Sequence, residues 1–165
     1  MMSEPRLEQR AVAHYVAIPA QARLPELPGV LDGVFPEIFG WVGQHGLAPA
    51  GPPFIRYLVT DMSKPLEFEV GLPVASSTPG DARVQSGELP AGTYATLVHT
   101  GPYDKLAQAT AYLLDWAKKN NIVFETSRRG EDEVWRARLE FYPTDPREEP
   151  DQEKWQTILA FLTAG

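Results

Sequence analysis

Two segments of the chain carry apolar residues at intervals of three and four, the spacing of a helix that buries one face. The apolar positions of the first segment are Leu31, Val34, Phe35, Ile38, Phe39 and Val42. Those of the second are Leu106, Ala109, Leu113, Trp116 and Ala117. We therefore predict one helix over about residues 29–45, and another that begins at Gly101-Pro102-Tyr103-Asp104 and ends near Asn120-Asn121.

Strands are predicted where apolar and polar residues alternate, or where β-branched and aromatic residues cluster, between turn residues. The predicted strands cover residues 10–18, 54–59, 66–70, 92–99, 134–142 and 155–161. Pro19 is expected to end the first strand, because proline cannot donate to a sheet ladder. Arg128 and Arg129 are expected in a solvated loop.

The predicted elements follow the order strand, helix, strand, strand twice. Trp41 and Trp116 take equivalent places on the two helices. A duplication with repeats at about residues 8–74 and 84–163 explains this match; the alternative is that two amphipathic helices agree by periodicity alone. We predict an α+β fold in a single domain over residues 1–165. One antiparallel sheet would carry two helices on one face, with a ligand groove between the halves.

The composition argues against several classes of function. Hydrophobic residues make up 43% of the 165 and charged residues 22%, which is typical of a globular domain. The net charge of -7 would repel a nucleic-acid backbone, so we predict no direct nucleic-acid binding. The chain has no cysteine, and no apolar run approaches the ~20 residues of a membrane span. We therefore expect a cytoplasmic protein without disulfides that does not enter a membrane.

Few residues carry candidate chemistry. His14, His45 and His99 lack the paired spacing of metal ligands, and we find no phosphate-loop, dinucleotide or serine-hydrolase motif, so we predict no metal and no cofactor. Alternation along one predicted strand places Ala137, Leu139 and Phe141 on one face and Arg136, Arg138, Glu140 and Tyr142 on the other. The second face is either an ordinary solvated one, with glutamate paired to arginine, or a functional one.

Several short motifs resemble those of one known family and occur in the same order along the chain. They are Gly-Glu-Leu-Pro-Ala-Gly at 87–92, the segment 97–106 with Gly-Pro-Tyr-Asp, and 140–146, while 51–57 and 67–73 also fit. Together they are similar to the GyrI-like small-molecule-binding domain, over about residues 8–163. The resemblance implies a duplicated strand-helix-strand-strand fold whose central groove takes bulky, often cationic aromatic compounds. Such domains occur fused to DNA-binding modules in AraC- and MerR-type regulators, and alone in proteins linked to toxin protection.

The resemblance also implies roles for individual residues. Glu140 matches the pocket glutamate of the family, and Tyr57, Tyr103 and Tyr142 lie on or beside the motifs that line the pocket. A carboxylate among aromatic rings suits a cation, because burial strengthens the Coulomb attraction and ring faces add cation–π energy. The same burial raises a carboxyl pKa, which would also suit a general acid or base.

Four further positions bear on the site. Phe54 and Glu69 are additional candidates for ligand binding, with a solvated sheet edge as the alternative for Glu69. Leu31 and Leu139 stand where many relatives carry aromatic residues, so the ligand can differ from theirs.

Three functions follow as hypotheses. The leading one is a stand-alone binding domain for hydrophobic, aromatic, cationic small molecules, acting by sequestration or sensing in protection against drugs or toxins. The alternative is a hydrolase of cyclopropane-type genotoxic natural products, in which Glu140 acts with help from Tyr57 or Tyr142. The third is interaction with a protein such as gyrase or a separate regulator. No helix-turn-helix pattern flanks the domain, so we do not expect a complete regulator, and the oligomeric state is left open.

Overall fold

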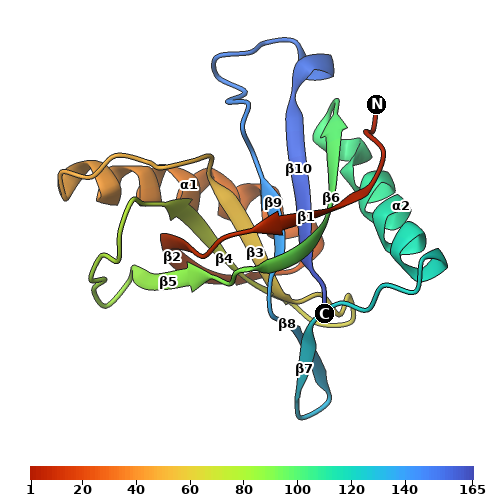
Figure 1. The fold of residues 1–165 in the computed structure, drawn as a ribbon. Helices are drawn as coiled ribbons and strands as arrows, with labels where there is room; N and C mark the ends of the chain where they lie inside the picture. Colours follow the sequence, from red (N-terminus) through yellow and green to blue (C-terminus); the bar gives the residue numbers. More distant parts are fainter.

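The computed structural model describes residues 1–165 as one large antiparallel sheet with two helices (Figure 1). The eight strands of the sheet are β1 (Arg6–Arg10), β2 (Ala13–Ala22), β3 (Phe54–Val59), β4 (Leu66–Pro73), β5 (Gln85–Leu89), β6 (Gly92–Thr100), β9 (Arg138–Phe141) and β10 (Gln156–Leu162). Their order across the sheet is β1-β6-β10-β9-β3-β4-β2-β5. The predicted α+β class with one main sheet is confirmed.

The helices are α1 (Leu27–Gln44) and α2 (Leu106–Lys119). They lie over different parts of the sheet, because α1 contacts β2 and β4 whereas α2 contacts β6. Short 3-10 turns η1 (Leu24–Glu26) and η2 (Tyr103–Lys105) lead into them, and η3 (Gln152–Lys154) precedes β10. A separate hairpin of β7 (Thr126–Arg129) and β8 (Asp132–Trp135) projects from the sheet (Figure 1). Neither helix combines the length and the apolar character that spanning a membrane would require.

Both helices cover the same face of the sheet. Residues directly paired across an antiparallel ladder point to the same side. One such row crosses six strands, from β2 to β6, through Ile18, Val70, Ile55, Glu140, Leu159 and Leu97. Helix α1 packs Val34 and Ile38 on the first end of this row, and α2 packs Ala109 and Leu113 on the other end. The middle strands β3 and β9 therefore lie between the two helices.

The order of elements is β2-α1-β3-β4 in the first half and β6-α2-β9-β10 in the second, where β7 and β8 come before β9. This is the predicted order with an added hairpin. That the two halves derive from one duplicated sequence remains a prediction.

The strands β1 and β2 run alongside β6 and β5 as one continuous two-stranded ribbon. Arg10 pairs with Gly92 at the end of β1, and Ala13 pairs with Leu89 at the start of β2. Each strand advances by three residues between these two pairs, so the register is unbroken where both strands bend. The hydroxyl of Tyr94 donates to the carbonyl of Pro90 at 2.7 Å and stabilises one of the two bends.

This ribbon forces the sheet to curl. In the strand order β1 and β2 stand six steps apart, which is roughly 29 Å in a flat sheet. Only residues 11 and 12 connect them, and a link of that length spans about 11 Å at most. The ends of the sheet are therefore brought together, and the face without helices becomes the inner face of the curl. Its core contains Tyr15, Phe54, Tyr94, Leu139 and Phe141, all buried.

Three predictions about strands are corrected. Strand β2 continues through Pro19 to Ala22, because β5 pairs only with residues 13–17 and leaves the rest of that edge free, so the missing N–H needs no partner. The predicted strand 134–142 divides into β8 and β9. Between them the N–H of Arg136 donates to the carbonyl of Glu125, and the carbonyl of Ala137 accepts from the N–H of Leu162. At this point the chain therefore leaves the hairpin and enters the main sheet.

The third correction concerns the basic pair in the predicted loop. Arg128 and Arg129 lie in strand β7, and Arg129 donates to Glu67 of β4 at 2.6 Å. The hairpin is thereby tied to the main sheet by an ion pair that the sequence pattern did not indicate.

Candidate functional site

Glu140 occupies the middle of the apolar row on the helix-bearing face. Its ladder neighbours are Ile55 on β3 and Leu159 on β10, and both are fully buried. The alternation of β9 explains this position, since Leu139 and Phe141 face the inner core and turn Glu140 to the other side. The strand thus places one ionisable side chain where neighbouring strands place aliphatic ones.

The carboxylate of Glu140 has two tyrosine partners. The hydroxyl of Tyr142 donates to Oε1 at 2.5 Å, and the hydroxyl of Tyr57 donates to the same oxygen at 3.2 Å. Tyr57 comes from β3 and Tyr142 directly follows β9, so the pairing of these two strands brings both hydroxyls to one oxygen of Glu140. Oε2 accepts no hydrogen bond from a side chain or the backbone.

Burial raises the pKa of Glu140, while the two tyrosine hydrogen bonds and the charge of Arg138 oppose that rise. Burial and the neighbouring carboxylate also raise the pKa of Tyr57 and of Tyr142 well above the ordinary value. Both phenols therefore keep their protons and remain hydrogen-bond donors. The site combines a carboxyl group that is easier to protonate than usual with two neutral donors.

Aromatic rings connect this carboxylate to both helices. Tyr142 contacts Phe35 of α1 edge to face, with ring centroids 5.8 Å apart. On its other side Tyr103, at the start of η2, lies 5.9 Å from Tyr142 and 4.9 Å from Trp155. We call the set Phe35, Tyr57, Tyr103, Tyr142 and Trp155 the aromatic cluster. All five rings are at least partly exposed, so the cluster forms a surface and not a sealed core.

Arg138 lies two residues before Glu140 on the same face but does not pair with it. Its guanidinium lies over the rings of Trp135 and Phe161, at 4.7 and 4.9 Å from their centroids. The ordinary alternative, in which arginine neutralises Glu140 directly, is therefore not the arrangement found here.

The structure brings together Glu140, Tyr57, Tyr142 and Tyr103, four of the six predicted site residues. It does not bring Phe54 and Glu69 to them. Phe54 is buried in the inner core on the opposite face. The alternation of β4 turns Glu69 to that opposite face too, where its Oε1 accepts from the hydroxyl of Tyr15 and lies 3.4 Å from Nη1 of Arg56.

Two hollows on the surface, of about 380 and 330 Å³, are lined by other residues, and neither includes Glu140. The aromatic rings pack against one another beside the carboxylate. No group of three or more His, Asp or Glu side chains is placed to hold a metal ion.

Comparison with known proteins identifies the family. The model of the GyrI-like small molecule binding domain matches residues 20–160, which is most of the chain. The chain belongs to this family. The GyrI-like domain is thus a small-molecule-binding domain, and its fold places Glu140 and the aromatic cluster between the two helices.

Solved structures share this GyrI-like fold at low sequence identity. The C-terminal domain of EcmrR aligns with a TM-score of 0.77 and 20% identity, over 97% of this chain and 96% of that one. EcmrR in a cryo-EM complex with DNA aligns with a TM-score of 0.79 and 20% identity; this chain is covered to 97% and spans 57% of that one.

Two other solved structures are similar. SAV2435 bound to tetraphenylphosphonium has a TM-score of 0.62 and 12% identity, over 99% of this chain and 95% of that one. A hydrolase from Listeria innocua has a TM-score of 0.61 and 14% identity, over 98% and 92% of the two chains. No curated protein sequence matches. Identities this low establish the fold alone.

Sequence reasoning missed two members of the aromatic cluster. The helical spacing places Phe35 on the buried face of the first helix, yet it lies one turn after Leu31 and supplies a ring beside Tyr142. The predicted strand 155–161 includes Trp155, but this residue precedes β10, and its indole N–H donates to the carbonyl of Glu149 at 2.7 Å. The only sequence signal for their place in the cluster is that both are aromatic, Phe35 within a helix and Trp155 next to a turn.

Proposed function

We propose that this GyrI-like domain binds hydrophobic, aromatic cations, with Glu140 as the charge that opposes them, and that it acts by sequestration or sensing. The observation that carries the proposal is a partly buried carboxylate whose only hydrogen-bond partners are two neutral phenols, beside partly exposed aromatic rings. A cation placed there gains a charge partner and ring faces together. Tetraphenylphosphonium, to which SAV2435 is bound in its solved structure, has this chemistry.

We propose that a bulky cation reaches Glu140 by moving rings of the aromatic cluster apart. Its rings contact one another along the line from Phe35 through Tyr142 and Tyr103 to Trp155. Phe35 is on α1, whereas Tyr103 and Trp155 are on turns, so separate elements can move these rings apart. Entry of a flat or propeller-shaped aromatic cation between them would replace ring–ring contacts by ring–ligand contacts.

The proposal is tested by titrating tetraphenylphosphonium into the wild type and Glu140→Gln by calorimetry. We expect at least a tenfold loss of affinity, about 1.4 kcal/mol, because the amide keeps the shape of the side chain and removes its charge. Glu88→Gln is the matched control, since Glu88 lies exposed on the edge strand β5 and the same change there should leave the affinity unchanged. Equal affinity in the wild type and Glu140→Gln would refute the role of the charge.

A neutral ligand separates charge from shape. Triphenylphosphine oxide has a similar ring arrangement without the positive charge, so its affinity should differ little between the wild type and Glu140→Gln. A parallel loss for this neutral compound would mean that the substitution damages the site itself.

A second function rests on the raised pKa of Glu140, which burial causes and which suits a general acid or base. We propose it as the alternative: hydrolysis of a cyclopropane-type electrophile, with Tyr57 or Tyr142 as a helping donor. Mass spectrometry of such a compound after incubation would distinguish the two functions. Repeated turnover to a product heavier by one water supports hydrolysis, whereas recovery of the unchanged compound in a stoichiometric complex supports binding.

A further inference from the structure

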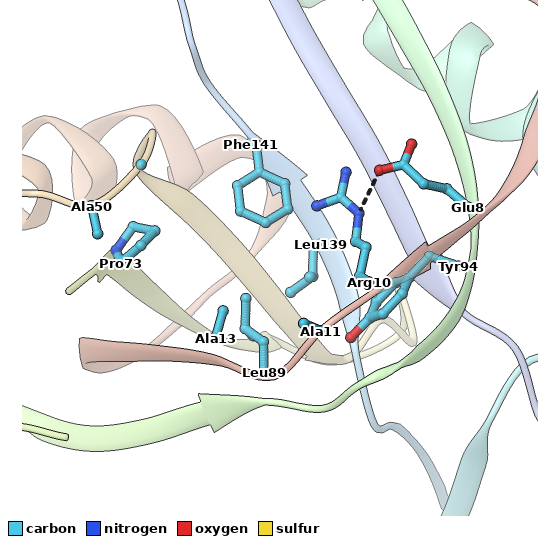
Figure 2. A pocket seen from close by; sticks show the side chains of 11 residues that line it. Glu8, Arg10, Ala11, Ala13, Ala50, Pro73, Leu89, Tyr94, Leu139 and Phe141 are labelled. Atoms are coloured by element: carbon cyan, nitrogen blue, oxygen red, sulfur yellow. Dashed lines mark ion pairs between the residues drawn. The ribbon is translucent and has the colours of Figure 1, made fainter. Parts of the chain in front are cut away.

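One of the two surface hollows lies on the opposite side of the sheet from Glu140, where the two bends of the ribbon meet (Figure 2). Its volume is about 380 Å³, within the range of small-molecule sites. We call it the ribbon hollow. Its lining comes from the inner face, both bends and the loop before β3: Glu8, Arg10, Ala11, Ala13, Ala50, Gly51, Pro73, Leu89, Tyr94, Leu139 and Phe141.

Arg10 is the cation of the ribbon hollow, and aromatic rings fix its position. Its guanidinium carbon lies 5.3 Å from the ring centroid of Phe141 and 5.8 Å from that of Tyr94. The side chain is 28% exposed, so the guanidinium is held between rings but remains reachable from solvent. Figure 2 shows it beside Phe141, on the side of the hollow opposite Ala13 and Leu89.

The hydrogen-bonding capacity of Arg10 is unused. Its Nε is buried without a hydrogen-bond partner, although Oε1 of Glu8 lies 3.3 Å away as an ion pair. Glu8 also pairs with Arg6, whose Nη2 lies 3.2 Å from its other carboxylate oxygen. Two arginines thus share one carboxylate, which leaves a positive balance at the mouth of the hollow.

The other walls of the ribbon hollow are largely apolar. Leu139 and Phe141 form one side, and Ala13 and Leu89 form another, where β2 pairs with β5. No other charged side chain lines the space besides Glu8 and Arg10. An occupant therefore needs an apolar body and one anionic group at the Arg10 end.

We propose that the ribbon hollow binds a small carboxylic acid with an apolar or aromatic body, independently of the site at Glu140. The carboxylate pairs with the guanidinium of Arg10, whose planar fork matches two carboxylate oxygens, and the body lies against Leu89, Leu139 and Ala13. The charge of this ligand is opposite to the charge that Glu140 attracts. The two sites use alternate residues of β9, so one layer of sheet separates them.

The test uses 2-naphthoate as the probe, titrated into the wild type and Arg10→Gln with calorimetric or NMR detection. We expect saturable binding to the wild type and at least a tenfold loss in Arg10→Gln. The neutral analogue 2-naphthamide should bind the wild type at least tenfold more weakly than 2-naphthoate. Unchanged naphthoate affinity in Arg10→Gln, or no saturable binding to the wild type at millimolar concentration, would overturn the proposal.

Two further variants separate this site from the one at Glu140 and from effects on folding. Glu140→Gln should bind naphthoate as the wild type does, and Arg10→Gln should bind tetraphenylphosphonium as the wild type does. If Arg10→Gln is unfolded by circular dichroism, Ala13→Phe carries the test, because its ring fills the hollow without touching the charge pair. Naphthoate affinity that Ala13→Phe leaves unchanged, or that depends on Glu140, would place the probe elsewhere and overturn the proposal.

Discussion

Glu140 interrupts a row that is otherwise aliphatic across six strands, and a partly buried carboxylate there costs stability. Two tyrosine hydroxyls reduce that cost without removing it, because both donate to the same oxygen and Arg138 is engaged with aromatic rings. A leucine at this position would continue the apolar row between Ile55 and Leu159. The carboxylate is therefore better explained by binding or catalysis than by stability.

Stability should reveal Glu140 through its dependence on pH. Burial raises the pKa in the folded protein above the unfolded value of about 4.3. Below the unfolded pKa the carboxyl is protonated in both the folded and the unfolded state, so its titration does not change the free energy of unfolding. Between the two pKa values only the folded state keeps the proton, so the free energy of unfolding falls as pH rises, and above the folded pKa the loss is complete.

The measurement is urea denaturation of the wild type and Glu140→Gln from pH 4 to pH 8. Glu140→Gln should become more stable relative to the wild type as pH rises through this window. Exposed carboxylates such as Asp81, whose pKa hydrogen bonds lower to about 2, titrate in both proteins and cancel in the difference. Parallel stability curves for the two proteins would contradict the raised pKa.

At the scale of elements, glycine decides how β3 and β4 pack on the inner face. Gly71 pairs directly with Phe54, and a Cβ at this glycine would lie 2.4 Å from Cζ of the Phe54 ring. The ring has no room to retreat, because it is fully buried and contacts Tyr15 and Phe141. The ring of Phe54 therefore fits between β3 and β4 on the inner face only because its paired residue, Gly71, has no side chain.

We predict that Gly71→Ala lowers the free energy of unfolding by about 1–3 kcal/mol, the usual cost of overpacking a rigid core. Gly40→Ala is the matched control, since Gly40 is exposed on α1 with nothing within 4 Å of its added Cβ. That control should gain about 0.5–1 kcal/mol from helix propensity. Chemical denaturation measures both, and a Gly71→Ala protein as stable as the wild type would show that Phe54 can yield.

The sequence predicted the elements whose burial is periodic. Both helices, β3, β4, β6 and β10 follow from that pattern. Strands β1, β5 and β7 were missed because they are four or five residues long and mostly polar, and their pairing partners stabilise them. Within the site, alternation placed Glu140 and Tyr142 on one face, and the family resemblance selected Glu140. The place of Phe35 and Trp155 in the aromatic cluster could not be predicted, because their contacts join residues distant in sequence.

At the scale of the whole molecule, the curl makes each half depend on the other. Strand β1 pairs with β6, and β2 pairs with β5, so both edges of the sheet are joined across the halves. The ribbon hollow lies at this junction, whereas the aromatic cluster lies at the β3–β9 seam on the other face. The two proposed sites thus occupy opposite sides of the contact between halves.

Removing residues 1–10 should expose the edge of β6. We predict a lower melting temperature and concentration-dependent self-association, since an unpaired strand edge recruits other chains. Thermal denaturation and sedimentation velocity measure these effects. Arg10→Gln serves as the control that removes the Arg10 contacts while keeping β1, and a shortened chain that stays monomeric with an unchanged melting temperature would contradict the role of β1.

The ribbon also sets an order of events during synthesis. Arg6 and its partner Thr96 are 90 positions apart in the chain. At a ribosomal rate of roughly 5–20 residues per second, β1 emerges roughly 5–20 s before the strand with which it pairs. Until then the β1 segment is unpaired and mostly polar, and its single apolar residue, Leu7, gives the incomplete chain little surface for misassociation. The polar composition of β1, which gives it no apolar alternation, thereby protects the chain during this interval.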